Sequence, residues 1–345
     1  MCSRSAPPSR EDGTVLLSTL LVLSLMSAVA LALLATLRSS VTRTAELDAA
    51  AQADLYARGA ADFVRSQIDA VSQVDGAALG ARLAVTEPVI LPFENGLISV
   101  AVSDGSHCFR LSGLVDSSGV GSDTARQQFE ALMLALGTDP VQAARVAGAA
   151  VDWIDADSQL SANGAEDGIY MSRTDLPHRT ANVPMQSVTE LRALEGMGEI
   201  LFRTLLPHVC IGEDGVPTRF NIDTAEPRHA PVLAVILGGG REAERVALEL
   251  IQSRPSGGYG SRDALNAAPV LDGYENKAAR LGDIVYTPQR IVAETTVRFG
   301  PVERAQLLAY EGLDKPPPRL TYRAWGREEF PSLIRADQPA EEPPR

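Results

Sequence analysis

One segment near the middle of the chain gathers the side chains that could do chemistry. Residues 151–157 read Val-Asp-Trp-Ile-Asp-Ala-Asp, and residues 164–170 read Gly-Ala-Glu-Asp-Gly-Ile-Tyr. Clustered carboxylates at the end of a predicted helix and across a loop with Gly and Asn suit Ca²⁺, which takes roughly six to eight hard oxygen ligands without strict geometry. The candidate calcium ligands are therefore Asp152, Asp155, Asp157, Glu166 and Asp167.

The same carboxylates leave other interpretations open. Their spacing is not that of an EF-hand, because the required Gly and terminal Glu positions differ. The absence of a neighbouring His argues against zinc. The alternative to a metal site is a solvated acidic loop in which the Asp residues cap helices and form turns.

Carboxylates can also act as a general acid and base in catalysis. A membrane-anchored periplasmic hydrolase is therefore one alternative function for the chain. The sequence offers this enzyme little further support. Its histidines are scattered, no Gly-x-Ser-x-Gly elbow is present, and nothing pairs a nucleophile with a base. The four histidines are His107, His178, His208 and His229.

Two segments, 187–206 and 220–253, each read as helix, Gly-containing turn and helix, like the hairpin modules that bind DNA backbones. Acidic residues stand where such modules place basic ones: Glu195 and Glu199 flank the first turn, and Arg241 is followed by acidic residues near the second. The net charge of −13 also argues against a nucleic-acid partner. Structural hairpins are the favoured interpretation, with a DNA-uptake minor pilin as a further alternative.

The sequence before these segments predicts a membrane-length helix, which would anchor the rest of the chain, here called the head. Residues 14–37 have no charge and would span roughly 36 Å, enough for a bilayer core of about 30 Å. No small-x-small cleavage site follows them, which argues against a secretory signal peptide. A short leader ending in Gly13, directly before Thr14 and the apolar run, is the pattern of a type IV pilin-like precursor cut after Gly13. A plain signal anchor is the alternative.

The helix is expected to continue into a soluble half at residues 38–80. No Pro occurs from position 38 to 72, and only Gly59 interrupts a helix-favouring composition. A stripe with a four-residue repeat predicts an amphipathic helix that packs its apolar face on the head. The stripe is Leu47, Ala51, Leu55, Gly59 and Phe63, extended by Val64, Ile68 and Val71.

The rest of the chain divides by pattern into an α+β fold. Strands at 84–102 and 108–111, with turns at 94–96 and 104–105, predict an antiparallel meander, the first part of a sheet at 81–121. Residues 122–282 are mostly helical. Residues 292–299 alternate with period two, and a turn at Gly300 leads to a partner strand at 304–310, the second part of the sheet at 283–315. A large helical domain inserted in one antiparallel sheet follows, with a loosely held tail at 316–345.

Of three cysteines, Cys2 lies in the leader. Cys108 and Cys210 would lie outside the membrane, where a disulfide is allowed. Two buried thiols are the alternative.

The chain resembles the minor pseudopilin K family of bacterial type II secretion systems over nearly its whole length, and four parts in sequence order carry the resemblance. They are the leader and helix, the two acidic runs at 152–157 and 164–170, residues 182–191, and the run Phe-Asn-Ile-Asp-Thr-Ala at 220–225. The resemblance implies a type IV pilin-like fold with a helical insertion, calcium in that insertion, and a non-enzymatic role at the pseudopilus tip in protein export across the outer membrane. It implies an inner-membrane anchor with a periplasmic head, processing by prepilin peptidase, and assembly with minor pseudopilins I, J and H and the major pseudopilin G.

Two positions depart from the usual pilin pattern. Glu11 and Asp12 stand where a leader usually ends in basic residues. The mature chain would carry Ser18 as its fifth residue in place of the Glu of major pilins. A carboxylate inside a bilayer is costly unless it is paired, and a subunit with nothing above it has no amine to pair with. Ser18 therefore fits a tip position.

Overall fold

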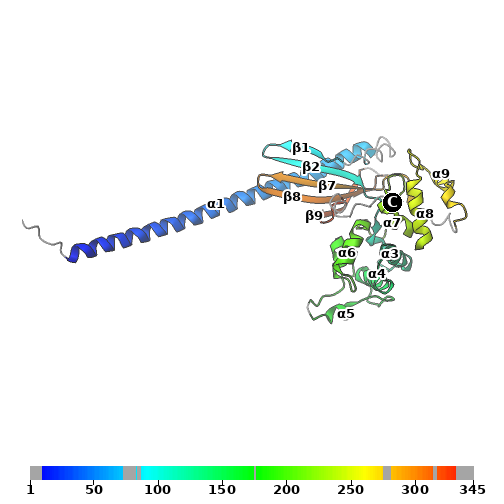
Figure 1. Cartoon of the computed structure of the whole chain (residues 1–345), viewed down its shortest axis with the longest axis horizontal. Helices are drawn as coiled ribbons and strands as arrows, with labels where there is room; N and C mark the ends of the chain where they lie inside the picture. The colour runs from blue at the N-terminus through cyan, green and yellow to red at the C-terminus, as the bar shows by residue number, and fades with distance from the viewer. Residues whose placement is uncertain are drawn as a thin grey trace, which may run out of the picture.

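The computed structural model describes residues 10–72, 83, 87–174, 176–274, 281–313 and 317–331. Its most prominent element is the helix α1, Arg10–Ser72, which projects far beyond the head as a single rod (Figure 1). This confirms the expected continuous helix as far as residue 72, and residues 73–80 of the predicted soluble half lie outside the described residues. Side chains from residue 14 to 48 are exposed, and within the described residues α1 is long and apolar enough to cross a membrane.

The second half of α1 lies on a five-stranded antiparallel sheet with the order β1-β2-β7-β8-β9. The strands are β1 Val89–Phe93, β2 Gly96–Asp104, β7 Arg290–Phe299, β8 Val302–Glu311 and β9 Arg319–Trp325. Since β2 and β7 are neighbours, with Asp104 opposite Ile291, the chain leaves the sheet and returns to it at adjacent points. The described residues between Asp104 and Arg290 form the insertion, whose bounds are wider than the predicted 122–282.

The face of α1 that packs on the sheet is not the predicted one. Ala53 and Ala57 are fully buried, whereas Leu55 and Phe63 of the predicted stripe are 59% and 45% exposed. Small side chains let the helix approach the strands so closely that the Gln306 side chain donates a hydrogen bond of 2.6 Å to the carbonyl oxygen of Ala57. The bulkier residues are left on the outer surface of the helix, and only the extension of the stripe at Val64 and Ile68 is buried.

The insertion is mainly helical and has its own apolar core, which also packs against β8 and β9. Its α-helices are α3 Asp123–Ala135, α4 Pro140–Ile154, α5 Asp167–Met171, α6 Glu199–Leu205, α7 Ala230–Ile236, α8 Gly240–Gln252 and α9 Arg262–Asn266. Short 3₁₀ turns are η1 Leu111–Leu114, η2 Val188–Ala193, η3 Leu206–His208, η4 Pro227–His229 and η5 Pro269–Leu271. Two-residue strands pair in parallel within it, β3 Phe109–Arg110 with β4 Val209–Cys210, and β5 Phe220–Asn221 with β6 Ile284–Val285.

Two expectations for the strands were wrong. Residues 108–111 do not extend the meander, because β7 occupies the side of β2 where a third strand would pair, and β3 instead joins β4. The tail predicted from residue 316 contains the edge strand β9, which pairs with β8 along Gln306–Glu311. The proposed strand start at 84–86, residues 1–9 of the leader and residues 332–345 of the tail lie outside the described residues.

The two predicted hairpins differ from each other. The second is α7 and α8 joined through Gly238, Gly239 and Gly240, all of which have positive φ, so the turn requires glycine. The first is not a pair of α-helices, because its first arm is the 3₁₀ turn η2, begun by Ser187 and Glu190 in a capping box. Both hairpins pack their apolar side chains into the core of the insertion.

Candidate metal centre

The end of helix α4 positions the acidic segment. Asp139 caps the start of α4 by accepting from the N–H groups of Val141 and Gln142, and Pro140 occupies the first turn. Nearly every residue from Val146 to Ile154 is buried, so the helix is fixed in the core. Its last turn and the residues after it therefore hold Asp152, Asp155 and Asp157 at a defined place.

Three of the five predicted ligands converge. Oxygen atoms of Asp155, Asp157 and Glu166 all lie within 4.8 Å of one another. Asp155 is 4% exposed and Glu166 is 9% exposed, while Asp157 faces solvent. One oxygen of Asp155 (Oδ1) and one of Glu166 (Oε1) are buried and accept no hydrogen bond from the residues that the structure describes. Carboxylate oxygens buried in this way are destabilising unless a cation or a proton compensates them.

The pKa values of these carboxylates also indicate that the group needs a cation or a proton. Burial, followed by repulsion from Asp152, Asp157 and Glu166, raises the pKa of Asp155 to about 7. Burial and the charge of Asp152 also raise the pKa of Glu166. Mutual repulsion between carboxylates at this distance favours taking up either protons or a cation.

The other two predicted ligands lie outside this group of three and accept hydrogen bonds from neighbouring segments. Asp152 is fully buried and accepts hydrogen bonds from the backbone N–H of Ser161 at 3.1 and 3.3 Å, which folds the loop over the end of α4. Asp167 begins α5 and accepts from Arg179 at 3.0 Å and from the Thr180 N–H at 2.9 Å. These donors lower the pKa of Asp167, whose ionised carboxylate is paired with Arg179. Asp167 is therefore not brought into the cluster.

A neutral oxygen that was not among the predicted ligands lies beside the cluster. The side-chain N–H of Asn182 is 3.4 Å from the carbonyl oxygen of Asp157, and its backbone N–H donates to the carbonyl oxygen of Trp153 at 3.0 Å. Asn182 has a positive φ of 50°, and its side-chain oxygen is buried without a hydrogen-bond partner. Only the φ preference of Asn hinted at this position in the sequence. Three carboxylates and an amide oxygen form a donor set suited to Ca²⁺.

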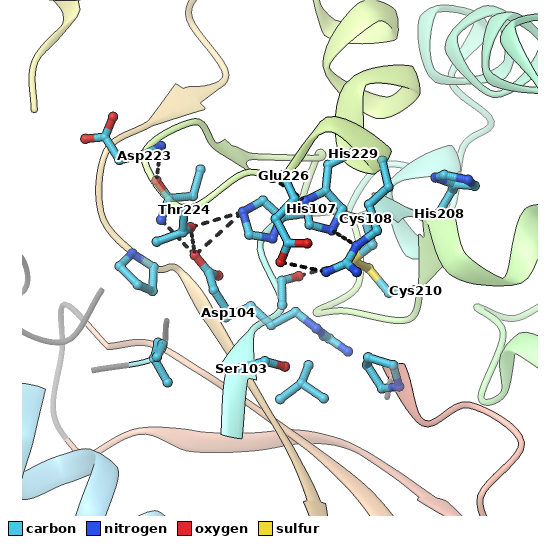
Figure 2. A pocket seen from close by; sticks show the side chains of 18 of the residues that line it. Ser103, Asp104, His107, Cys108, His208, Cys210, Asp223, Thr224, Glu226 and His229 are labelled. Carbon is cyan, nitrogen blue, oxygen red and sulfur yellow. Dashed lines mark hydrogen bonds and ion pairs between the residues drawn. A yellow bond between two sulfur atoms is a disulfide. The ribbon is translucent and has the colours of Figure 1, made fainter. Parts of the chain in front are cut away.

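A second polar cluster lines a cavity of about 750 Å³ where the insertion meets the sheet (Figure 2). The expectation that the histidines are scattered was wrong in part, because the rings of His107 and His229 stack there at 4.3 Å. Cys108 and Cys210, which also line the cavity, are joined by a disulfide. The disulfide is one of the two states that the sequence left open.

The N-terminal positions lie on α1. Gly13 and Thr14 are both within the helix, which begins at Arg10. Ser18 is exposed on the membrane-length part, and its hydroxyl donates a hydrogen bond of 2.9 Å to the carbonyl oxygen of Val15. The helix backbone thus satisfies the only polar group of this side chain, which suits an apolar environment.

The sequence is similar to that of known proteins over most of its length. A family model described as type II secretion system (T2SS), protein K matches residues 107–214. Type II secretion system protein K of Klebsiella pneumoniae is 31% identical over 306 residues, covering 84% of this chain and 89% of the relative. Protein K of Pectobacterium carotovorum subsp. carotovorum is 32% identical, covering 76% of this chain and 81% of the relative.

A solved structure shares the fold. A chain of the GspK–GspI–GspJ complex from the type 2 secretion system of enterotoxigenic Escherichia coli matches with a TM-score of 0.60 and 20% identity, covering 79% of this chain and 99% of that chain.

Proposed function

The chain belongs to the type II secretion system protein K family, and we propose that it caps the tip of the pseudopilus and starts assembly of the filament. In this role it is a non-enzymatic part of the machine that exports proteins across the outer membrane. Its head would stand in the periplasm, and α1 would hold it in the inner membrane after prepilin peptidase cuts between Gly13 and Thr14.

The apolar outer surface of α1 carries this proposal. Val41, Leu47, Leu55 and Phe63 are 68%, 63%, 59% and 45% exposed on the part of the helix that would lie near or outside the membrane. The head covers the opposite, alanine-rich face. An exposed apolar stripe of this length is costly in water and fits the groove of another helix. The occupants that we propose are the N-terminal helices of minor pseudopilins I and J, because the solved structure that shares this fold is a GspK–GspI–GspJ complex.

The insertion supports the place at the tip. It projects from the sheet over a large part of the head (Figure 1), so a filament of identically stacked heads would have to accommodate it at every repeat. A single subunit at the end has no such restriction. Ser18 adds to this, because a neutral side chain in the membrane needs no partner above it. Minor pseudopilin H and the major pseudopilin G would then join below.

Calcium is the proposed cofactor. Asp155, Asp157 and Glu166 would hold the ion, with the side-chain oxygen of Asn182 as a neutral ligand. Bound calcium would neutralise the repelling carboxylates and tie the loop after α4 to the start of α5. The loops would then be rigid without further apolar packing.

The hydrolase alternative is not favoured by the grouping of Asp104, His107 and Thr224. The Thr224 hydroxyl donates to Asp104 at 2.5 Å and is 3.1 Å from His107 Nε2. Its proton is therefore directed to the carboxylate, whereas an activated nucleophile must give its proton to the base. Asp104 is in addition occupied by donors from Ser106 and Asn221.

The proposal is tested by mixing the soluble head, from residue 38 onward, with the soluble heads of pseudopilins I and J. Size-exclusion chromatography with light scattering would report the assembly. A ternary complex with one copy of each head is expected. A head that stays monomeric with I and J, singly or together, would contradict the tip role.

A further inference from the structure

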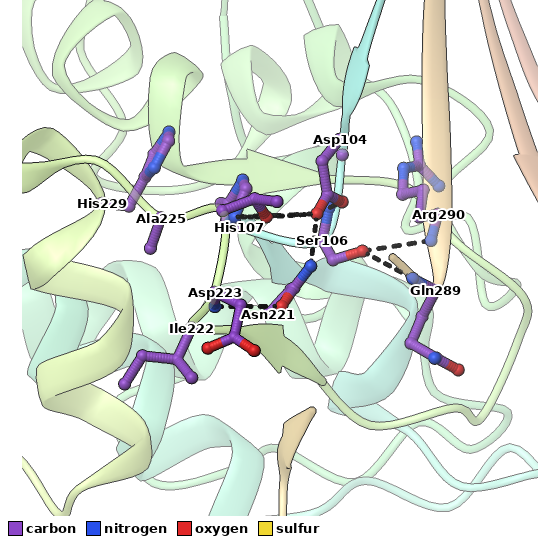
Figure 3. Close-up of polar contacts among 12 residues, drawn as sticks. Asp104, Ser106, His107, Asn221, Ile222, Asp223, Ala225, His229, Gln289 and Arg290 are labelled. Carbon is purple, nitrogen blue, oxygen red and sulfur yellow. Dashed lines mark hydrogen bonds and ion pairs between the residues drawn. The ribbon is translucent and has the colours of Figure 1, made fainter. Parts of the chain in front are cut away.

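The chain passes between the sheet and the insertion at one place, where β2 ends and β7 begins. The N–H of Gly105 donates to the carbonyl oxygen of Arg290 at 2.9 Å. The Ser106 hydroxyl accepts from the N–H groups of Gln289 at 2.9 Å and Arg290 at 3.1 Å (Figure 3). A side chain at position 105 would collide with Val292, so glycine permits this close approach. The two crossing segments are thus fastened to each other.

The two hydrogen-bonded crossing segments form a narrow connection, which by itself would let the insertion rotate relative to the sheet. A third point of attachment comes from residues 220–225, whose run Phe-Asn-Ile-Asp-Thr-Ala has no other assigned role. Asn221 is fully buried, and its side-chain amide donates to Asp104 at 2.7 Å. The Thr224 hydroxyl donates to the same oxygen of Asp104 at 2.5 Å. Asp104 is the last residue of β2, so these bonds join the insertion directly to the sheet.

Further hydrogen bonds join the segments of this network to one another. The backbone N–H of Asn221 donates to the carbonyl oxygen of Ser106 at 3.1 Å, and the Asn221 side-chain oxygen accepts from the N–H of Asp223 at 3.1 Å. The Asp104 carboxylate is almost completely buried, with its side chain 4% exposed. A buried carboxylate with several donors is directional, because moving it leaves a charge without hydrogen bonds.

We infer that Asp104, Asn221 and Thr224 form a latch that sets the orientation of the insertion on the sheet. The apolar core between the insertion and β8 and β9 favours burial but is not directional. A directional contact to β8 comes from the buried ion pair of Arg110 with Glu311, at 3.0 Å. The latch adds a second directional contact by fixing one loop of the insertion to the end of β2. It is a property of the folded head and holds whether or not the tip role does.

Distance measurement by pulsed electron paramagnetic resonance tests this latch on the full chain in detergent. Spin labels would be placed on Ile90 of β1, 63% exposed, and on Val141 of α4, 68% exposed. The background is Cys2→Ser, and Cys108 and Cys210 are protected by their disulfide. The wild-type latch should give a single narrow distance peak. Thr224→Val and Asp104→Ala should shift or broaden that peak, and Thr224→Ser, which keeps the hydroxyl, should restore it.

The control variant is Thr204→Val, which removes a hydroxyl that bonds only to the Ile200 carbonyl oxygen within α6. It should leave the peak unchanged. The thermal transition of the insertion, followed by the fluorescence of the buried Trp153 in a Trp325→Phe background, should be retained in the latch variants. Unchanged distances in both Thr224→Val and Asp104→Ala would overturn the latch. Loss of the Trp153 transition in Thr224→Val would overturn it too, because the residue would then belong to the core of the insertion.

Discussion

Asp155 and Glu166 lie on different elements, yet their carboxylate oxygens approach within 4.8 Å, and each keeps one buried oxygen that accepts no hydrogen bond. The first follows the last turn of α4, and the second stands just before α5. Two charges placed in this way destabilise the loops unless something compensates them. The relationship therefore predicts that the inserted domain responds to cations and to pH.

The first prediction is that calcium stabilises the head through this cluster. At a free concentration about 100 times the dissociation constant, binding should add roughly 2.7 kcal/mol to the free energy of unfolding. Asp155→Asn and Glu166→Gln should lose most of the calcium-dependent rise in Tm, measured by differential scanning fluorimetry with calcium and with chelator.

The matched control is Asp167→Asn. Its carboxylate is bound to Arg179 and Thr180 and is not among the three carboxylates that converge. This variant should keep the full calcium response. If Asp167→Asn lost the response and Asp155→Asn kept it, the assignment of ligands would be wrong.

The second prediction concerns pH. The folded pKa of Asp155, about 7, lies above its usual value of 3.8, so in this range the calcium-free folded state binds more protons than the unfolded state. Stability from this group is therefore present at low pH and is lost as pH rises from about 4 through about 7. In chelator, Tm should rise when pH is lowered from neutral toward 5. Asp155→Asn should flatten that rise, and saturating calcium should abolish it at neutral pH.

How far the sequence predicts this molecule depends on which contacts are local. The absence of proline from 38 to 72 predicts one helix, and the alternation at 292–299 predicts β7, because both patterns lie within one element. The buried face of α1 was not predictable in the same way. Its outer face also carries large apolar side chains, Leu55 and Phe63, and the choice of the alanine face depends on how closely Gln306 approaches the helix. Strand β9 directly follows three prolines, and this proline-rich composition predicts an irregular tail in its place.

The candidate site shows the same division. Spacing alone places Asp155 and Asp157 together at the end of α4. It cannot show that Asp167 turns away to Arg179, or that Asn182 returns to the loop, because both contacts depend on the path of residues 172–182.

The third prediction concerns the disulfide between Cys108 and Cys210, which are separated by 102 positions. A loop of this length should lose about 4.7 kcal/mol of unfolded-state entropy on closure. Replacing both cysteines by serine should lower the free energy of unfolding by roughly 2–5 kcal/mol in denaturant titrations. Reductant should destabilise the wild type by a similar amount and leave the double variant unchanged. Equal stability of the two proteins under oxidising conditions would refute this contribution.

The fourth prediction separates the two faces of α1. Leu55→Gln and Phe63→Gln alter exposed side chains, so they should change the stability of the head by no more than about 0.5 kcal/mol while weakening capture of partner heads. Ala57→Leu overpacks a fully buried site against the sheet and should cost about 1–3 kcal/mol. Thermal unfolding and a binding titration on the same samples would measure both effects. Partner binding that survives both Gln substitutions would exclude the outer stripe as the contact surface.

The most direct measurement is the position of this protein on assembled filaments. Pseudopili would be sheared from cells that overproduce the major pseudopilin, and antibody against the inserted domain, coupled to gold particles, would be applied for electron microscopy. A tip subunit should give label at one end of each filament and nowhere along its length. Label distributed along the filaments would contradict the capping role, and so would filaments of normal number and length in cells that lack this protein.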